Sequence, residues 1–479
     1  MTTPAPFVDG RLFVGGALSE GSRSTPVRAP FDDAVIADVQ RADAAILERA
    51  LAIGVAAEPV MAQLPTHERR TILRRIAEGI RTRGDQLAHT IVLEAGKPLK
   101  YARSEVERGA QTFDFAADCA WRLGDEAIPL DAVPPGLGRY GIVRRFPVGL
   151  CAAVSPFNFP LNLVAHKLAP AFAAGCPVVL KPASQTPLTA LLLARICQEA
   201  GLPDGGLSVL PCDRTSADLL VTDPRPKVLS FTGSADVGWD LKARAGRKRV
   251  VLELGGNAAV VVHDDADVDW AVRRITTGAF AYAGQICISV QRIYIHQAIF
   301  DDVQERLVAA AAAVPSGDPM IEATECGPLI DDTSVARCGQ WIAEAKTAGA
   351  RVLCGGRTEK RVFAPTLIEG ATLPHRVVRD EAFAPVACLF SFTSLDDAIT
   401  AVNDSSFGLQ AGIFTDSLNC VWRFYEGAQV GGVIHNDAPI FRVDHMPYGG
   451  VKDSGFGREG LPSSLHDYTE PRLLALRPG

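Results

Sequence analysis

Two residues combine a reactive side chain with a local setting that could support covalent catalysis. Glu253 lies within residues 251–257, an otherwise apolar segment that contains two glycines. A charge is unfavourable there unless it has a partner or a task, so we expect a catalytic carboxylate. Cys287 lies in a glycine turn at residues 284–288. Neighbouring backbone amides can lower a thiol pKa from its free value of about 8.5, and the thiolate then attacks carbonyl carbons.

Three further segments could bind a ligand, although each alone is a weak signal. Residues 155–160 form a turn with one amide and two aromatic rings after an apolar strand. Lys181 follows the strand 178–180, and Gly233 and Ser234 follow another strand. In α/β folds such strand ends hold ligands, and a helix start binds phosphate. A plain proline turn and a surface lysine are the alternative interpretations.

Gly136, Gly138 and Gly141 match the G-x-G-x-x-G spacing of the dinucleotide-binding fingerprint, but their context does not match it. The fingerprint follows a strand and opens a helix. Here two prolines precede the motif, and residues 142–147 predict a strand behind it. We therefore interpret the motif as a glycine-rich turn that leads into a strand.

The elements that would position these residues alternate between strands and helices. Residues 66–93 carry apolar side chains at helical spacing and predict one long amphipathic helix. Beyond it, the expected strands are 150–154, 178–180 and 292–296, and the expected helices are 161–174, 186–200, 298–313 and 333–348. Because strand and helix in turn imply parallel βαβ units, we expect two α/β lobes.

The composition of the 479-residue chain is that of an ordinary globular protein, with 47% hydrophobic and 22% charged residues. The net charge is −7 without a basic cluster, so neither nucleic acid nor a membrane surface is expected as a partner. No signal peptide or membrane-spanning run is predicted. The eleven cysteines lack metal-binding spacing, which predicts a cytoplasmic protein without a metal site. Apart from Cys287, we expect them to be inert.

Taken together and in this order, these segments resemble the NAD(P)-dependent aldehyde dehydrogenase superfamily over essentially the whole chain. The resemblance continues through residues 381–386 and 447–455. It rests above all on Leu-Glu-Leu-Gly-Gly-Asn followed by Gly-Gln-x-Cys, a combination highly specific to that family. It implies an enzyme that oxidises an aldehyde to its carboxylic acid with NAD or NADP.

The resemblance also implies the fold and its division. The fold would be α/β, with a Rossmann-like cofactor lobe and a catalytic lobe, each on a parallel sheet, plus a small β bridging element. The cofactor-binding domain would take residues 1–117 and 140–253, the catalytic domain 254–457, and the bridging element 118–139 and 458–479. The bridging element would join subunits into a homodimer or homotetramer.

For catalysis, the resemblance implies three roles. Cys287 would add to the aldehyde as the nucleophile and form a thiohemiacetal. The side-chain amide of Asn158, with the backbone N–H of Cys287, would hold the developing oxyanion. Glu253 would act as general base, both for the thiol and for the water that hydrolyses the thioacyl enzyme.

The implied cofactor residues include one that bears on selectivity. Lys181 would bind the adenosine ribose or its phosphate, and Glu381 the nicotinamide ribose. NAD-preferring members typically carry a glutamate where this chain has Ser184, and its charge would repel a 2′-phosphate, so we predict that NADP is accepted, alone or with NAD. Residues 211–214 replace the usual glycine-containing turn, a departure in the same part of the site. The full set is Ser155, Phe157, Lys181, Ser184, Gly233, Ser234, Leu254, Glu381 and Phe383.

Matching the pocket positions of the family places six residues around the aldehyde: Phe159, Asn162, His166, Ala281, Arg442 and Tyr448. This set is polar, and Arg442 offers several donors to an anion. Succinate-semialdehyde dehydrogenases have arginines at positions 166 and 281. We therefore expect a short hydroxylated or anionic aldehyde, of the lactaldehyde or glyceraldehyde-phosphate kind, rather than succinate semialdehyde. The alternative is that Arg442 pairs with Asp444 or points to solvent.

Two other functions stay open at this point. In a coenzyme-A-acylating aldehyde dehydrogenase, coenzyme A and not water resolves the thioester. Glu253 argues against it, because acylating members such as methylmalonate-semialdehyde dehydrogenase lack a glutamate there. A non-catalytic nucleotide-binding protein could use the same fold. The presence of Cys287, Glu253 and Asn158 together argues against that reading.

Overall fold

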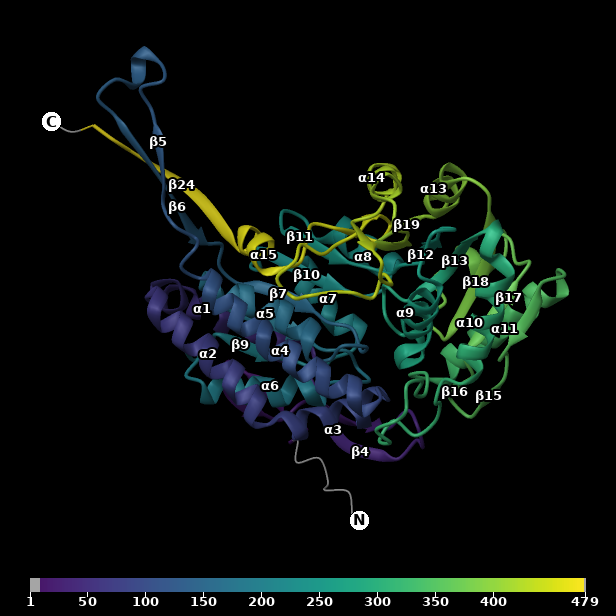
Figure 1. Cartoon of the computed structure of the whole chain (residues 1–479). Helices are drawn as coiled ribbons and strands as arrows, with labels where there is room; N and C mark the ends of the chain where they lie inside the picture. Colours follow the sequence, from purple (N-terminus) through teal and green to yellow (C-terminus); the bar gives the residue numbers. More distant parts are fainter. Residues whose placement is uncertain (1–8, 478–479) are drawn as a thin grey trace.

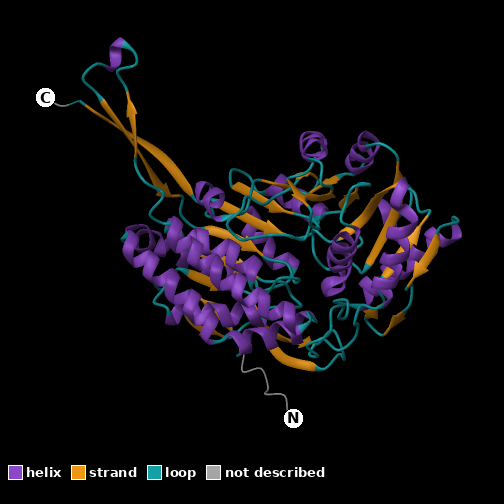
Figure 2. Ribbon diagram, in the orientation of Figure 1, coloured by secondary structure: helices purple, strands orange, loops and turns teal. Residues whose placement is uncertain are grey.

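The computed structural model describes residues 9–477, which form two lobes and a projecting arm (Figures 1 and 2). The first lobe contains an eight-stranded sheet with the order β2-β1-β9-β8-β7-β10-β11-β23. Its strands are β1 (Leu12–Val14), β2 (Ala17–Ser19), β7 (Cys151–Val154), β8 (Val178–Lys181), β9 (Leu207–Val209), β10 (Val228–Thr232), β11 (Arg249–Glu253) and β23 (Gly455–Phe456). β7 to β11 are parallel. Strand order reverses beside β7, and doubly wound sheets bind ligands at the carboxyl ends of such strands.

Helices cover both faces of this sheet because its strands are apolar on both sides. Along β8, Val178 and Leu180 pack into one core and Val179 packs into the opposite one, as the alternation of side chains along a strand requires. The first core is closed by α2 (Thr66–Thr82), α3 (Gly84–Ala95), α4 (Leu99–Cys119), α5 (Asn162–Ala174) and α6 (Leu188–Glu199). The second is closed by α1 (Ala44–Gln63) and α7 (Arg214–Thr222).

The single helix expected over residues 66–93 is wrong, since the chain forms two helices, α2 and α3. The break lies at Arg83, which has φ −102° and ψ 22°. Ile80 and Leu87 are two helical turns apart, so the apolar stripe stays in phase across the break. Both helices pack on α4 and α6. Periodicity alone therefore could not reveal the break.

The second lobe contains a seven-stranded sheet with the order β14-β17-β18-β13-β12-β20-β21. All neighbours are parallel except β14 and β17. Its strands are β12 (Ala258–Val262), β13 (Val290–His296), β14 (Arg351–Cys354), β17 (Thr366–Glu369), β18 (Val386–Phe392), β20 (Gln410–Phe414) and β21 (Gly432–His435). Around it lie α9 (Val268–Phe280), α10 (Phe300–Ala312), α11 (Asp332–Thr347), α12 (Arg376–Arg379), α13 (Leu395–Asn403) and α14 (Leu418–Gly427). The expectation of two parallel-sheet α/β lobes is confirmed.

Residues 254–257 connect the two sheets by running from the end of β11 to the start of β12. This short connection brings the carboxyl edge of the first sheet to the amino edge of the second. Two glycines make the close approach possible. A Cβ on Gly255 would lie 2.4 Å from an oxygen of Glu381, and a Cβ on Gly256 would lie 2.2 Å from the carbonyl oxygen of Cys287.

The arm is a three-stranded sheet of β5 (Glu126–Pro129), β6 (Tyr140–Pro147) and β24 (Thr469–Leu476), and it projects from the body (Figure 1). The rejected glycine motif belongs to it. Gly136 ends a short 3₁₀ turn, Gly138 has a φ of +73°, and Gly141 lies within β6. The interpretation as a turn that leads into a strand is confirmed.

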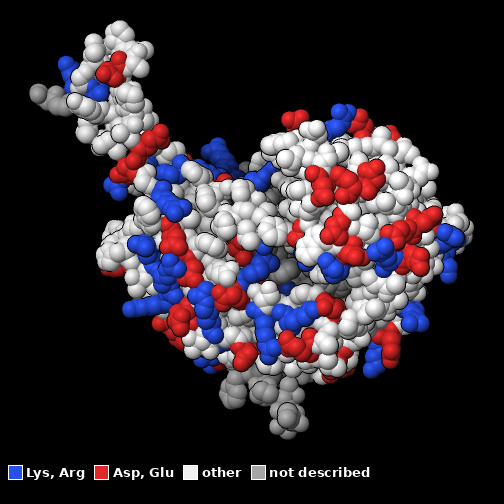
Figure 3. Space-filling model, in the orientation of Figure 1, with Lys and Arg blue, Asp and Glu red and all other residues white. Residues whose placement is uncertain are grey.

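The remaining strands and α-helices within residues 9–477 are β3 (Arg23–Arg28), β4 (Val35–Arg41), α8 (Ala235–Arg244), β15 (Thr358–Glu359), β16 (Val362–Phe363), β19 (Phe407–Gly408), β22 (Val451–Lys452) and α15 (Leu461–Asp467). Within residues 9–477, no helix has the length and apolar character needed to cross a bilayer. Positive and negative side chains are interspersed over the face shown in Figure 3. The domain boundaries given above stay a prediction.

Candidate active site

Cys287 is held in a tight loop between a 3₁₀ turn (Ala281–Gly284) and β13. Tyr282 and Ala283 have φ values of +51° and +54°, a left-handed conformation that costs free energy in residues with side chains. The buried side chain of Gln285 fixes the loop, because it accepts an N–H from Ile330 at 2.9 Å and donates to the carbonyl of Pro328 at 3.1 Å. The surrounding structure therefore imposes the position of the thiol.

The thiol of Cys287 is protonated in this environment. Burial raises its pKa to about 12, although the Tyr448 hydroxyl lies 2.9 Å from the sulfur and, with the charge of Arg442, opposes that rise. Only the thiolate is a good nucleophile. The site therefore needs a base or a nearby positive charge to activate it.

Asn158 lies beside the same loop. Its side-chain amide donates to the carbonyl of Gln285 at 2.9 Å, and the residue is buried. A carboxamide has two N–H groups, so the second is available to a ligand oxygen. The structure thus brings Asn158 and the Cys287 loop together, in the arrangement that the family resemblance implies, and their roles stay a prediction.

Glu253, at the carboxyl end of β11, is a buried carboxylate whose two oxygens have no hydrogen-bond partner among the described residues. Burial raises its pKa well above the ordinary range, and the charge of Glu459 adds to that effect, whereas Arg442 and Lys167 oppose it. Lys167 lies 3.5 Å and Arg442 lies 3.2 Å from Glu459. An orphaned acid with a raised pKa is suited to accept and release a proton.

Sequence reasoning missed Lys167 and Glu459, which set the electrostatics around Glu253. Lys167 could have been found, because it interrupts the apolar segment that forms α5. Glu459 gave no comparable signal. Glu459 is brought to the site by an antiparallel bridge between its backbone and that of Tyr448, a contact that the sequence does not reveal.

The carboxyl edge of the first sheet forms a cavity of about 500 Å³. In the register of the sheet, Val154 of β7 lies between Lys181 of β8 and Phe231 of β10. These three neighbouring strands therefore end at the same edge. Lys181 donates to the carbonyl of Pro182 at 3.2 Å, and burial lowers its pKa. The cavity is lined by Val154, Lys181, Ala183, Ser184, Gln185, Arg214, Ala217, Asp218, Val221, Phe231, Asp236, Val237, Asp240, Leu241 and Arg244.

The other predicted cofactor residues lie near this edge or in the loops that face it. Gly233 and Ser234 immediately precede α8, and the hydroxyl of Ser155 is buried with no hydrogen-bond partner within residues 9–477. Leu254 packs against Phe231 in the apolar layer.

From the second lobe, Glu381 accepts the N–H of Gly256 at 3.0 Å, and burial raises its pKa to about 7. Phe383 packs edge-on against Phe157 with ring centres 5.8 Å apart.

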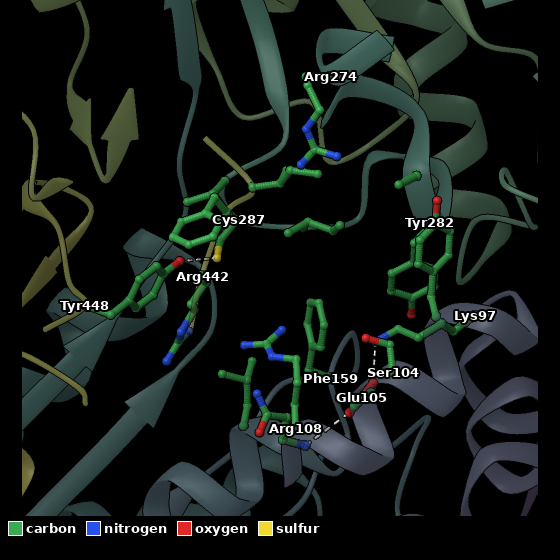
Figure 4. Close-up of a pocket in the computed structure, with 18 residues that line it drawn as sticks. Lys97, Ser104, Glu105, Arg108, Phe159, Arg274, Tyr282, Cys287, Arg442 and Tyr448 are labelled. Atoms are coloured by element: carbon green, nitrogen blue, oxygen red, sulfur yellow. Dashed lines mark hydrogen bonds and ion pairs between the residues drawn. The ribbon is translucent and has the colours of Figure 1, made fainter. Parts of the chain in front are cut away.

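A second cavity, of about 310 Å³, opens at Cys287 (Figure 4). Five of the six predicted substrate residues line it: Phe159, Asn162, Ala281, Arg442 and Tyr448. His166 is not among the lining residues. It is buried, with Nε2 2.9 Å from a carboxylate oxygen of Asp444. His166 therefore lies behind the cavity wall.

Arg442 adopts neither arrangement given by the alternative interpretation. Its guanidinium lies over the Tyr448 ring at 3.7 Å and donates to Glu459 at 3.2 Å. Asp444 is bound instead by Arg108, which donates to both carboxylate oxygens at 2.8 Å and 3.1 Å. Arg442 is thus a lining residue that is not exposed to bulk solvent.

Three basic residues of the cavity were missed: Lys97, Arg108 and Arg274. A signal existed in α4, where Tyr101, Glu105 and Arg108 recur at three- and four-residue spacing and so share one helix face. Lys97 pairs with Glu105 inside the protein, and burial lowers the pKa of Lys97 to about 8. Glu105 also accepts the backbone N–H groups of Leu161 and Asn162.

Comparisons with known proteins agree with this geometry. The model of the aldehyde dehydrogenase family matches residues 18–474. The 3-sulfolactaldehyde dehydrogenase of Priestia aryabhattai is 41% identical over 411 residues, which cover 86% of this chain and 86% of the relative.

Two solved structures superimpose closely. Aldehyde dehydrogenase 21 from Physcomitrella patens, in complex with the reaction product succinate, has a TM-score of 0.96 and 42% identity and covers 98% of both chains. Glyceraldehyde-3-phosphate dehydrogenase from Methanocaldococcus jannaschii, complexed with NADP, has a TM-score of 0.92 and 36% identity. That match covers 95% of this chain and 100% of the neighbour.

The environment of Cys287 predicts how its reactivity depends on pH in the cofactor-free protein. Because the pKa is raised to about 12, the thiolate fraction should rise about tenfold for each pH unit between 7 and 10. Iodoacetamide labelling of Cys287, followed by peptide mass spectrometry, should accelerate accordingly. Tyr448→Phe removes the hydroxyl that stabilises the thiolate and should slow labelling at every pH. Cys287→Ala is the control that measures labelling of the other cysteines. A labelling rate of Cys287 that does not depend on pH would contradict the raised pKa of its thiol.

Proposed function

The chain belongs to the aldehyde dehydrogenase family, whose members oxidise aldehydes with NAD or NADP, and we propose that its substrate is a short anionic aldehyde. One observation carries the proposal: Cys287 and several guanidinium groups line the same small cavity. The nucleophile would attack the carbonyl, and the arginines would bind the opposite end of the substrate.

In the proposed first step, the sulfur of Cys287 forms a bond to the aldehyde carbon. The thiol proton leaves before or during attack, and Glu253 is the base whose partner-free oxygens can receive it. The free N–H of Asn158 and the backbone N–H of Cys287 would hold the resulting oxyanion. Removing such a donor typically costs about 2.7–4 kcal/mol in the barrier.

The thiohemiacetal carbon would then give up a hydride, for which bound NAD(P) would supply the acceptor, and become a thioester carbon. Once Glu253 has passed its first proton to solvent, it would take a proton from a water molecule that attacks the thioester carbon. The C–S bond then breaks, and the acid and the Cys287 thiol are released. A carboxyl whose pKa is raised by burial suits both roles of Glu253, because it holds a proton more tightly than an exposed carboxylate and can still pass it on. The presence of this base favours water over coenzyme A as the acceptor.

The residues at the carboxyl edge fit a nicotinamide dinucleotide. The apolar wall of Val154 and Phe231 suits the adenine, and Lys181 with Ser184 would hold the ribose or a 2′-phosphate. The partner-free hydroxyl of Ser155 and the start of α8 supply donors. When bound, the cofactor supplies the hydride acceptor. Glu381 would orient the nicotinamide ribose.

The basic cavity supports an anionic group on the substrate. Two related proteins are named as dehydrogenases of 3-sulfolactaldehyde and of glyceraldehyde 3-phosphate, and a third is in complex with succinate. Positions 166 and 281 lack the arginines of succinate-semialdehyde dehydrogenases, but α4 supplies Arg108 to the same cavity. Succinate semialdehyde is therefore included among the candidate substrates. We keep carboxylate, sulfonate and phosphate as candidate groups.

We also propose a cytoplasmic homodimer or homotetramer. All eleven cysteines are free thiols, which suits a reducing compartment. The arm exposes apolar side chains, including Leu473, Leu474 and Ile128, and such surfaces commonly mark subunit contacts.

The proposed roles of Cys287 and Glu253 predict different defects. Cys287→Ala should abolish oxidation. Glu253→Gln should slow turnover by about 10²–10⁴, as loss of a general base does, and a thioacyl enzyme should accumulate that intact-protein mass spectrometry detects. Glu107→Gln, which alters an exposed carboxylate on α4, is the control. Appreciable activity in Cys287→Ala, or turnover of the wild type only with coenzyme A, would contradict the mechanism.

The residue at position 184 predicts the cofactor preference. The wild type should accept NADP, and Ser184→Glu should lower kcat/KM for NADP at least tenfold because its charge repels the 2′-phosphate. Ser184→Ala, which removes only the hydroxyl, should have a smaller effect. Steady-state kinetics with both cofactors decide the point. A wild-type preference for NAD above about a hundredfold, or about 2.7 kcal/mol, would refute the idea.

Arg442 predicts selectivity between aldehydes. A charge-assisted hydrogen bond contributes about 1.5–3 kcal/mol, so Arg442→Leu should lower the ratio of kcat/KM for succinate semialdehyde to that for propanal by about ten- to a hundredfold. The ratio separates substrate binding from any effect on Glu253, which would slow both aldehydes alike. Equal losses on both, or a wild type that prefers long apolar aldehydes, would show that the substrate is not anionic.

A further inference from the structure

Asp444 is a buried carboxylate that binds residues of the cavity wall without lining the cavity itself. Arg108 donates to Oδ1 at 2.8 Å and to Oδ2 at 3.1 Å. Asn162 donates to Oδ1 at 3.0 Å, and His166 approaches the same oxygen at 2.9 Å. The side chain is 1% exposed, whereas that of Arg108 is 25% exposed. Asp444 therefore anchors a guanidinium that reaches the substrate space.

The geometry of the pair fixes the orientation of Arg108. Its Nε and one terminal nitrogen face Asp444, so the other terminal nitrogen points away from the carboxylate. The guanidinium carbon lies 5.9 Å from the centre of the Phe159 ring. A two-point contact with a buried anion removes the rotational freedom that an arginine side chain otherwise keeps.

His166 contributes to this anchor as a neutral donor. Burial, with the charge of Arg442, lowers its pKa, and a carboxylate can only accept, so Nε2 carries the proton that faces Asp444. That nitrogen then cannot accept an N–H from Arg442, although the two groups lie 3.3 Å apart. Arg442 consequently directs its terminal nitrogen to Glu459. Each arginine has its own buried carboxylate.

We propose that Asp444 is a positioning residue that orients the guanidinium of Arg108 so that its free terminal nitrogen faces the anionic end of the substrate. Selectivity for anionic aldehydes then depends on Asp444, although Asp444 does not touch the substrate. The inference rests on the proposed function, since it needs an anionic aldehyde. The proposed function requires positive charge in the cavity, whereas here the orientation of Arg108 is the source of selectivity.

A double-mutant cycle tests this assignment. kcat and KM are measured for succinate semialdehyde and for propanal with the wild type, D444N, R108L and D444N/R108L. Asp118→Asn is the matched control. Asp118 lies on α4, as Arg108 does, but its exposed carboxylate pairs with Arg74 of α2. D444N should lower the succinate semialdehyde to propanal ratio of kcat/KM at least tenfold, mainly through KM. The double variant should match R108L within about twofold, because Asp444 acts through Arg108.

Several outcomes would overturn the inference. They are an unchanged ratio in D444N, losses that multiply in the double variant, or a ratio in R108L equal to that of the wild type. None of these affects the test of the anionic substrate itself, which rests on Arg442 and on the preference of the wild type.

R108K keeps the test decisive if D444N does not fold. Lysine keeps the charge but cannot form the two-point contact with Asp444, and position 108 is partly exposed. The ratio for R108K should fall at least tenfold as well. A ratio within twofold of the wild type would show that charge alone suffices, and the positioning role would be refuted.

Discussion

The site depends on the short connection between β11 and β12. Residues 254–257 carry the chain directly from the carboxyl edge of one sheet to the amino edge of the other, so the loops that bear Cys287 and Glu381 lie close to this connection. Gly255 and Gly256 permit this, since a side chain on either would collide with Glu381 or with the carbonyl of Cys287. The base, the nucleophile loop and the Glu381 loop are consequently assembled by one constraint of chain geometry.

Burial then sets the chemistry of the assembled groups. In the described part of the chain, Glu253 has no hydrogen-bond partner and its pKa rises. The nearby Glu459 is paired with Lys167 and Arg442, and its pKa falls. The pKa values of these two neighbouring carboxylates are thus shifted in opposite directions, because only Glu459 is paired with cations. Such separation is what acid–base catalysis near neutral pH requires. Cys287 follows the same logic, since burial keeps it as an unreactive thiol until a proton acceptor acts.

The substrate cavity shows a repeated arrangement in which each basic lining group is paired with a carboxylate. The pairs are Lys97–Glu105, Arg108–Asp444, Arg274–Asp437 and Arg442–Glu459. An unpaired buried charge is costly, so these carboxylates allow several cations to gather in a small space. Each carboxylate also offsets the positive charge of the basic residue that it binds. Recognition of an anion must then rely on directed N–H groups, which makes the orientation of each guanidinium decisive.

The sequence by itself determined the alternation of strands and helices, the rejection of the Gly136 motif as a cofactor loop, and the segments that bear Cys287, Glu253 and Asn158. These follow from local patterns, because turn chemistry and a charge in an apolar strand are visible within a few residues. The break at Arg83 stayed hidden, since the apolar stripe keeps its phase. Only the tertiary structure decided which side chains line the cavity at Cys287. Arg108 enters the cavity from a helix distant in sequence, and His166 turns away to Asp444, because packing against other elements, not spacing along the chain, selects the direction of a buried polar side chain.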